Sequence, residues 1–277
     1  MTVSPTWKAE LEAFFDTRGI TVSRVPTIDE LCFVAGRDPR LWRDQALLED
    51  LQSDIVGHLK TGPQSRVLEV GCAGGFLARL VAPTVGSFTG IDLADGAVMA
   101  ARKLQLANAT FIVADGEKLA FPTGSFDAAF CYDVFSNFPT FDDGASLIVE
   151  MLRVVKPGGH VLVGSIPDAA TRDGYPGRVT EVAAELQQRH GPVPPPPVSA
   201  VKGLATRHGL LDRLRGRPAQ PSALATAVPR IVNYDFERRD FKNLASKLGV
   251  NVEICDVHRL NPYRGYRFNA IFMRRAA

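Results

Sequence analysis

The sequence has little cysteine, almost no net charge and no long hydrophobic run. Its four cysteines are too far apart for a Cys-x-x-Cys metal clip and too few for a disulfide-stapled secreted domain, so we expect reduced thiols and no metal site. They are Cys32, Cys72, Cys131 and Cys255. The 32 Lys and Arg residues balance 30 Asp and Glu residues to a net charge of +2, which lacks the basic excess common in nucleic-acid-binding proteins.

Membrane and secretion signals are also missing. No stretch approaches the roughly 18 apolar residues that span a bilayer, and the first ten residues lack the apolar core of a signal peptide. A cytoplasmic location is therefore expected. The chain is 45% hydrophobic and 22% charged over 277 residues, an ordinary globular composition that suits one large α/β domain or two small ones.

The first 60 residues carry helical patterns. A helix ending near Gly19 is predicted by large apolar residues at i, i+4, i+7 and i+8. Thr27 and Glu30 form a capping-box pattern, and Asp38-Pro39 predicts a second helix start. We expect that second helix to run on to Leu59, with one apolar face. The first apolar stripe comprises Trp7, Leu11, Phe14 and Phe15, and the last comprises Leu41, Leu48, Leu51, Ile55 and Leu59.

From Arg66 the pattern changes to β-branched runs that alternate with helical stretches. Strands are predicted at 66–70, 88–92, 110–114, 126–131 and 160–166, and helices at about 75–82, 95–106 and 142–153. This alternation predicts an α/β fold with a largely parallel sheet covered on both faces. Right-handed crossovers would then bring the loops after the strands to one edge.

Residues 168–238 interrupt this alternation. They contain a helix pattern closed by Gly191, a proline tract, and a basic segment from Lys202 to Arg217 that is either a solvated amphipathic helix or a site for an anionic ligand. A predicted helix at 239–248 follows. After it come two predicted strands, at 250–258 and 267–274, which form a hairpin. The predicted units are an N-terminal helical cap (1–60), a core (61–167), an inserted cap or lid (168–238) and a C-terminal segment that completes the sheet (239–277).

Four loops along the predicted sheet edge carry polar or glycine residues. The stretch 67–76, VLEVGCAGGF, runs from a buried strand through glycines into a helix, which allows close backbone approach to a ligand. Glu69 would repel a phosphate there and suits a cationic ligand. Asp92 ends the next strand, where a carboxylate can hold a ribose diol, and Asp115 ends the third. Each acid is alternatively a simple cap.

In these residues the segment from about 66 to 166 resembles the class I S-adenosylmethionine-dependent methyltransferases. The resemblance implies a Rossmann-like seven-stranded sheet with an antiparallel C-terminal strand, and S-adenosylmethionine as the cofactor, with S-adenosylhomocysteine as product. Ala73 stands where the family usually has its middle glycine. The cofactor-binding residues implied are Glu69, Gly71, Cys72, Ala73, Gly75, Asp92, Leu93, Asp115, Gly116 and Tyr132.

The loop after the fourth strand faces the methyl group in members of the family. Asp133 is thus a candidate base and Tyr132 a second candidate catalytic residue, although a helix cap explains Asp133 equally well. Asn137, Tyr175 and His208 are candidate substrate-binding residues. The Asn-Pro-Pro-Tyr motif of base-amino methyltransferases is absent from this loop, and we regard Asn261-Pro262-Tyr263 as a chance match on another loop.

The expected function is methyl transfer to an O or N atom of a small, biosynthetic and in some cases anionic acceptor. An RNA or tRNA base methyltransferase and a non-catalytic, cofactor-binding regulatory protein are the alternatives. Neither a nucleic acid nor a membrane is an expected partner, and a homodimer is compatible with the sequence.

Overall fold

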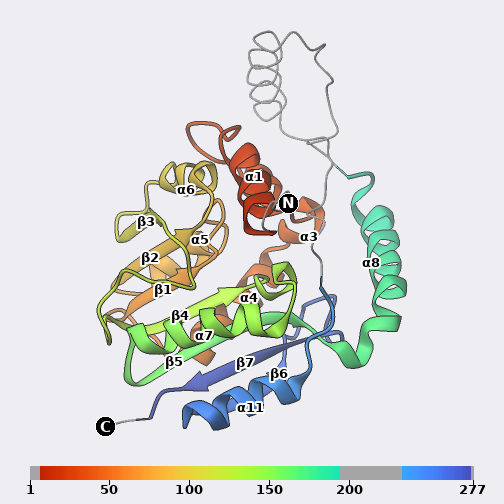
Figure 1. Ribbon diagram of the computed structural model, residues 1–277. Coiled ribbons are helices and arrows are strands. Elements are labelled where there is room, and N and C mark those ends of the chain that lie inside the picture. Colours follow the sequence, from red (N-terminus) through yellow and green to blue (C-terminus); the bar gives the residue numbers. More distant parts are fainter. Residues whose placement is uncertain (1–6, 194–232, 276–277) are drawn as a thin grey trace, which may run out of the picture.

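A seven-stranded sheet organises the computed structural model, which describes residues 7–193 and 233–275 (Figure 1). The strand order is β3-β2-β1-β4-β5-β7-β6. β1 to β5 pair in parallel, whereas β7 is antiparallel to both β5 and β6. The strands are β1 (Arg66–Val70), β2 (Ser87–Asp92), β3 (Ala109–Val113), β4 (Phe126–Tyr132), β5 (Val155–Pro167), β6 (Asn251–Asp256) and β7 (Arg267–Met273).

Helices cover both faces of this sheet. α4 (Gln45–Leu59), α5 (Ala78–Val81) and α6 (Asp95–Arg102) pack on one face, and α7 (Phe141–Val154) and α11 (Arg238–Leu248) pack on the other (Figure 1). Successive strand residues point to opposite faces, so Val67 joins the first apolar cluster and Leu68 the second. The predicted doubly covered α/β sheet and its C-terminal hairpin are confirmed.

The N-terminal helices follow their capping signals, with one exception. Thr27 and Glu30 form the expected capping box at α2 (Ile28–Val34). The prediction of a single helix from Pro39 to Leu59 is wrong, because the chain forms two helices there, α3 (Pro39–Trp42) and then α4. The Asp44 carboxylate accepts hydrogen bonds from the N–H groups of Ala46 and Leu47, at 2.9 and 3.2 Å, and so starts a new helix.

α1 (Trp7–Gly19) crosses α6 very closely at its C-terminal end. A Cβ atom at Gly19 would lie 2.1 Å from the backbone of Gly96, and one at Gly96 would lie 2.2 Å from the carbonyl oxygen of Asp16. The Asp16 carboxylate also accepts a 2.8 Å hydrogen bond from the Gly96 N–H group. This contact fixes α1 beyond the carboxyl ends of the central strands (Figure 1).

After β5 the chain forms two short turns of 3-10 helix, η3 (Ala169–Gly174), and then α8 (Tyr175–His190). α8 is tied to distant segments, since Arg40 donates to the Gly191 carbonyl at 2.9 Å and Arg178 donates to the Pro262 carbonyl at 2.8 Å. The tract 194–197, the basic segment Lys202–Arg217 and His208 lie outside the described residues. Among the helices that the structure describes, none is long and apolar enough to cross a membrane.

Candidate active site

The carboxyl ends of β1, β2, β3 and β4 border an open cavity of about 840 Å³, which we call the first cavity. α1 forms its outer wall through Trp7, Lys8, Leu11, Glu12 and Phe15. Seven of the predicted cofactor residues line it: Gly71, Ala73, Asp92, Leu93, Asp115, Gly116 and Tyr132. The sheet topology thus brings together loops that are consecutive in the sequence, as expected for parallel strands.

The glycine-rich turn after β1 depends on left-handed backbone. Gly71 has a φ of 80°, and a Cβ atom there would lie 2.6 Å from Cγ2 of Val134. Ala73 has a φ of 43°, a conformation that costs a non-glycine residue about 1 kcal/mol. The chain stabilises it through the Ala73 N–H group, which donates to Asp92 at 2.8 Å. Replacement of the family's glycine therefore leaves the turn intact but strained.

Asp92 lies buried at the end of β2 and organises the two neighbouring loops. Its carboxylate accepts a 2.8 Å hydrogen bond from Ala73 and a 3.0 Å hydrogen bond from Ala94. Burial raises the pKa of Asp92 above its usual value, although the hydrogen bonds from Ala94 and Ala73 act in the opposite direction. Asp92 is thus more than a helix cap, because it joins the glycine-rich turn to the start of α6.

Asp115 is held by a residue that the sequence did not single out. Lys8, from α1, donates to Asp115 at 2.9 Å and pairs with Glu117 at 2.8 Å. Burial lowers the pKa of Lys8, but the hydrogen bonds to Glu117 and Asp115 raise it above its usual value overall. The lysine therefore fastens the N-terminal half of α1 to the loop after β3.

Glu69 lies beneath the first cavity and does not line it. Its side chain is on the face covered by α4 to α6 and only 2% of the residue is exposed. Burial raises the pKa of Glu69 to about 8, while Arg37 lowers it and Asp92 raises it. At neutral pH the carboxyl group is mostly protonated, so the predicted repulsion of a phosphate by its charge is not supported.

Two other predicted cofactor residues also lie outside the lining. Cys72 is buried in the apolar cluster under α4 to α6, and burial raises its thiol pKa well above the usual value. Gly75 has a φ of 82°, and a Cβ atom there would lie 2.6 Å from Leu104, so this glycine allows the turn to pack against the end of α6. All four cysteines are free, as expected, and Cys255 is only partly buried.

A second open cavity, of about 1020 Å³, adjoins the first. Its walls come from the 35–42 segment, the loop after β4, the start of α8 and the hairpin between β6 and β7. It shares five residues with the first cavity: Phe15, Ala35, Arg37, Asp133 and Asn137. A molecule in the second cavity would therefore lie next to one in the first.

Asp133 lies between the cavities and binds two arginines. Its carboxylate oxygens lie 2.8 Å from Nη2 of Arg37 and 2.9 Å from Nη1 of Arg267. The alternative of a helix cap is not what the structure shows, since Val134 is the N-cap of η2 (Phe135–Asn137) and no side chain caps it. Because both oxygens are held by guanidinium groups, Asp133 is poorly suited to accept a proton.

Tyr132, the second candidate catalytic residue, lines the first cavity, and its hydroxyl group is buried without a hydrogen-bond partner in the described part of the chain. Burial raises the pKa of Tyr132 well above its usual value. The hydroxyl therefore stays protonated at neutral pH and can act as a hydrogen-bond donor.

Arg267, the first residue of β7, is positioned by an irregularity in β5. Its Nη1 donates to the carbonyl and hydroxyl oxygens of Ser165, at 3.0 and 3.2 Å, and its Nη2 donates to the Tyr175 hydroxyl at 3.0 Å. Ser165 has a φ of 58° where the β5–β7 register shifts, and Asn269 accepts its N–H at 2.9 Å. Burial lowers the pKa of Arg267, but Asp133 and Tyr175 raise it overall.

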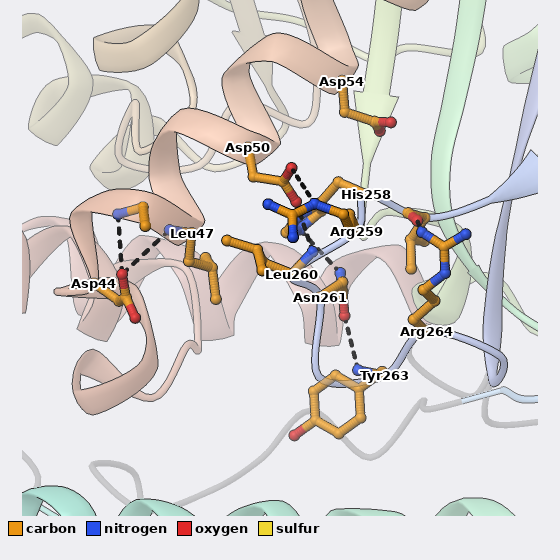
Figure 2. Close-up of polar contacts among 12 residues, drawn as sticks. Asp44, Leu47, Asp50, Asp54, His258, Arg259, Leu260, Asn261, Tyr263 and Arg264 are labelled. Atoms are coloured by element: carbon orange, nitrogen blue, oxygen red, sulfur yellow. Dashed lines mark hydrogen bonds and ion pairs between the residues drawn. The ribbon is translucent and has the colours of Figure 1, made fainter.

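A buried polar chain fixes the loop between β6 and β7 (Figure 2). The Asn261 side-chain oxygen accepts the Tyr263 N–H at 2.9 Å, which turns its amide nitrogen toward Nε2 of His258 at 3.2 Å. His258 must then accept at Nε2 and donate from Nδ1 to Asp50 of α4, 3.0 Å away. The network anchors the loop that brings Tyr263 to the second cavity.

The predicted substrate residues are only partly brought together. Asn137 lines both cavities and Tyr175 lines the second. Asn261 and Tyr263, which we took as a chance motif match, line the second cavity, with a different role from the motif. The sequence did not single out Lys8, Arg37 and Arg267, because their positive charge alone does not distinguish them from the other basic residues.

Comparison with known proteins identifies the central segment. Residues 68–163 match the family model of a methyltransferase domain. A fatty-acid O-methyltransferase from Mycolicibacterium smegmatis is 35% identical over 116 residues, which are 40% of this chain and 38% of that protein. A ubiquinone biosynthesis O-methyltransferase from Albidiferax ferrireducens is 33% identical over 124 residues, 43% of this chain and 48% of that protein. The matched segments thus span less than half of these relatives.

Solved structures share the fold over nearly the whole chain. The geranyl diphosphate C-methyltransferase of Streptomyces coelicolor has a TM-score of 0.54 at 13% identity, with 98% of this chain and 97% of that chain covered. A putative S-adenosylmethionine-dependent methyltransferase from Methanococcus maripaludis has a TM-score of 0.52 at 14% identity, with 95% of both chains covered. Residues 68–163 are thus a methyltransferase domain, and the chain that contains this domain shares the fold of solved S-adenosylmethionine-dependent methyltransferases.

Proposed function

We propose that this chain transfers a methyl group from S-adenosylmethionine to an oxygen or nitrogen atom of a small biosynthetic molecule. The observation that carries the proposal is the pair of adjoining cavities, one at the carboxyl ends of β1 to β4 and one walled mainly by segments outside the methyltransferase domain. A donor and an acceptor need such adjoining sites, because alignment of the reacting atoms supplies much of the rate.

The residues of the first cavity fit the cofactor. Asp92 lies at the end of β2, where a carboxylate holds a ribose diol, and Asp115 borders the same cavity. In the described part of the chain, Oε2 of Glu69 and the Tyr132 hydroxyl are buried without a hydrogen-bond partner. The Tyr132 residue borders the first cavity, and its hydroxyl group is suited to donate a hydrogen bond to the carboxylate at the methionine end of the cofactor.

The bound cofactor supplies an electrophilic methyl group on a sulfonium. The residues of the chain exclude water and orient the acceptor: α1 covers the first cavity, and Asn137, which lines both cavities, can hydrogen-bond a bound molecule. No histidine lines either cavity among the described residues.

The named relatives support a small acceptor. They include a fatty-acid O-methyltransferase, ubiquinone biosynthesis O-methyltransferases and a 2-methyl-6-phytyl-1,4-hydroquinone methyltransferase. The second cavity is also bordered by several separate chain segments, an arrangement that suits a small molecule better than a nucleic-acid duplex.

The test is calorimetric binding of S-adenosylhomocysteine, followed by methyl turnover with a panel of small acids, phenols and amines. We expect binding at micromolar concentration and turnover of at least one member. Failure of S-adenosylhomocysteine to bind would contradict the proposal. Binding without turnover, together with salt-dependent RNA binding and RNA methylation, would instead favour the nucleic-acid alternative.

A further inference from the structure

The second cavity contains two nearly buried arginines that one carboxylate cannot neutralise. The side chains of Arg37 and Arg267 are 10% and 12% exposed, and both pair with Asp133. Asp38, the other acid in the lining, already forms an ion pair with Arg40 at 2.7 Å. The three groups Arg37, Arg267 and Asp133 therefore carry a net charge of about +1, which favours an anion in the cavity.

Each of these arginines also retains a donor without an acceptor. Nη1 of Arg37 and Nε of Arg267 are buried and have no hydrogen-bond partner within residues 7–193 and 233–275. Buried polar groups in folded proteins are nearly always paired, so unpaired guanidinium N–H groups beside a cavity indicate a ligand that supplies acceptors. Guanidinium groups bind carboxylates and phosphates through several N–H groups at once.

Aromatic rings pack on the faces of both guanidinium groups. The N–H groups at the edges therefore stay available for hydrogen bonds to a ligand. The Arg37 guanidinium lies 4.6 Å from the ring centre of Trp42, and that of Arg267 lies 5.5 Å from Tyr175 and 5.8 Å from Tyr263. Stacking of this kind covers the flat faces of a guanidinium and holds its orientation. The same rings give the cavity apolar walls.

We propose that the methyl acceptor is a small organic acid with an apolar body, whose carboxylate or phosphate is bound by Arg37 and Arg267. This inference rests on the proposed function, because it treats the second cavity as the acceptor site. Arg37 also lines the first cavity, so the anionic group is held beside the cofactor. Tyr175 and Tyr263 contact the body of the molecule, and Asp133 keeps the two arginines at a fixed separation.

The experiment measures binding of matched probes to the full chain saturated with S-adenosylhomocysteine. The probes are 4-phenylbutyrate, its neutral amide 4-phenylbutyramide, and 2-phenylethyl phosphate, each titrated by NMR. We expect wild-type protein to bind at least one anion about tenfold more tightly than the amide. The preferred anion assigns the acceptor to the carboxylates or to the phosphates. Equal affinities for the anions and the amide, or no anion binding at millimolar concentration, would overturn the inference.

Variants locate the anion. Arg37→Gln should lower the affinity for the preferred anion about tenfold and leave the affinity for the amide nearly unchanged. Arg43→Gln is the matched control, because this arginine pairs with Asp29 on the surface away from both cavities. An anion preference that survives in Arg37→Gln would contradict the assignment.

Arg267→Gln removes a nearly buried charge and can impair folding, so Arg267→Lys is made beside it. The lysine keeps the charge but loses the planar fork, and we expect it to retain part of the anion preference. An unchanged preference in a folded Arg267→Lys variant, with no loss in a folded Arg267→Gln variant, would remove Arg267 from the site.

The same samples separate the two proposals. S-adenosylhomocysteine is titrated first into each protein. If it does not bind wild-type protein, the proposed function fails. If it binds and the anion preference is missing, only the acceptor assignment fails.

Discussion

The two cavities share a wall but are built from different parts of the chain. The first is formed mainly by loops that follow consecutive parallel strands, and its charged side chains are chiefly acidic. The second gathers residues from six places that lie far apart in the sequence, and its unpaired donors belong to arginines. Under the proposed function, the shared domain keeps the cofactor while the separate segments determine the acceptor.

Asp92→Ala is the strongest way to disturb the first cavity alone. The substitution removes the acceptor for the N–H groups of Ala73 and Ala94 together with the proposed ribose ligand. We expect the affinity for S-adenosylhomocysteine, measured by calorimetry, to fall roughly 100-fold, or about 3 kcal/mol. Asp95→Ala removes an exposed acid three residues further on and should leave the affinity unchanged. An unaltered affinity in Asp92→Ala would remove this residue from the cofactor site.

Asp133→Asn disturbs the second cavity instead. The amide leaves Arg37 and Arg267 without their carboxylate, so the free energy of unfolding in urea should fall by about 2 kcal/mol. The affinity for S-adenosylhomocysteine should change much less than in Asp92→Ala. Asp29→Asn, which breaks the surface pair with Arg43, should cost less than about 1 kcal/mol. Equal losses in the two variants would show that the Asp133 pairs do not stabilise the fold more than a surface pair does.

Glu69→Gln tests the buried wall below the first cavity. The pKa of Glu69 is raised from 4.5 to about 8, so between these values the folded protein binds a proton that the unfolded chain has released. The free energy of unfolding of wild type should therefore fall with rising pH, by about 1.4 kcal/mol per pH unit relative to Glu69→Gln, and level off above the folded pKa.

Urea unfolding across this pH range measures the difference. Glu253→Gln replaces an exposed carboxyl group on β6 and should show no comparable dependence on pH. Parallel pH profiles for wild type and Glu69→Gln would mean that Glu69 is not held in its protonated form.

Ala73→Gly gives the smallest expected effect. Glycine adopts the left-handed conformation without the clash of a Cβ atom, so the variant should be more stable by about 0.5–1 kcal/mol. Ala82→Gly is the matched control, since a glycine in that helical backbone should lower stability. Both are measured by thermal unfolding. A loss of stability in Ala73→Gly would show that the strain is offset by packing of the methyl group.

The sequence predicted the first cavity better than the second for a topological reason. Gly71, Asp92 and Asp115 follow successive strands, and a parallel sheet brings such positions together whatever the other side chains are. Arg37 and Arg267 are brought together through Asp133, which forms an ion pair with each of them. The three residues lie far apart in the sequence, so no local pattern reveals these contacts.

Two other features of the structure differ from what the local sequence patterns predicted. The apolar stripe from Leu41 to Leu59 favoured one helix, but the Asp44 carboxylate satisfies free N–H groups and starts a second one. Lys8 was overlooked because an exposed lysine on a helix is ordinary, and only the position of α1 over the loop after β3 gives it two acidic partners.

The hairpin of β6 and β7 has a consequence for how such proteins diversify. Its strands complete the sheet, whereas Asn261 and Tyr263 in its loop and Arg267 at the start of β7 border the second cavity. The network from Asp50 through His258 to Asn261 holds this loop without using residues of the methyltransferase domain. Under the proposed function, exchange of the 257–267 segment between relatives would therefore change the acceptor preference and leave the cofactor site unchanged, which makes this short segment a natural unit for evolution and for redesign.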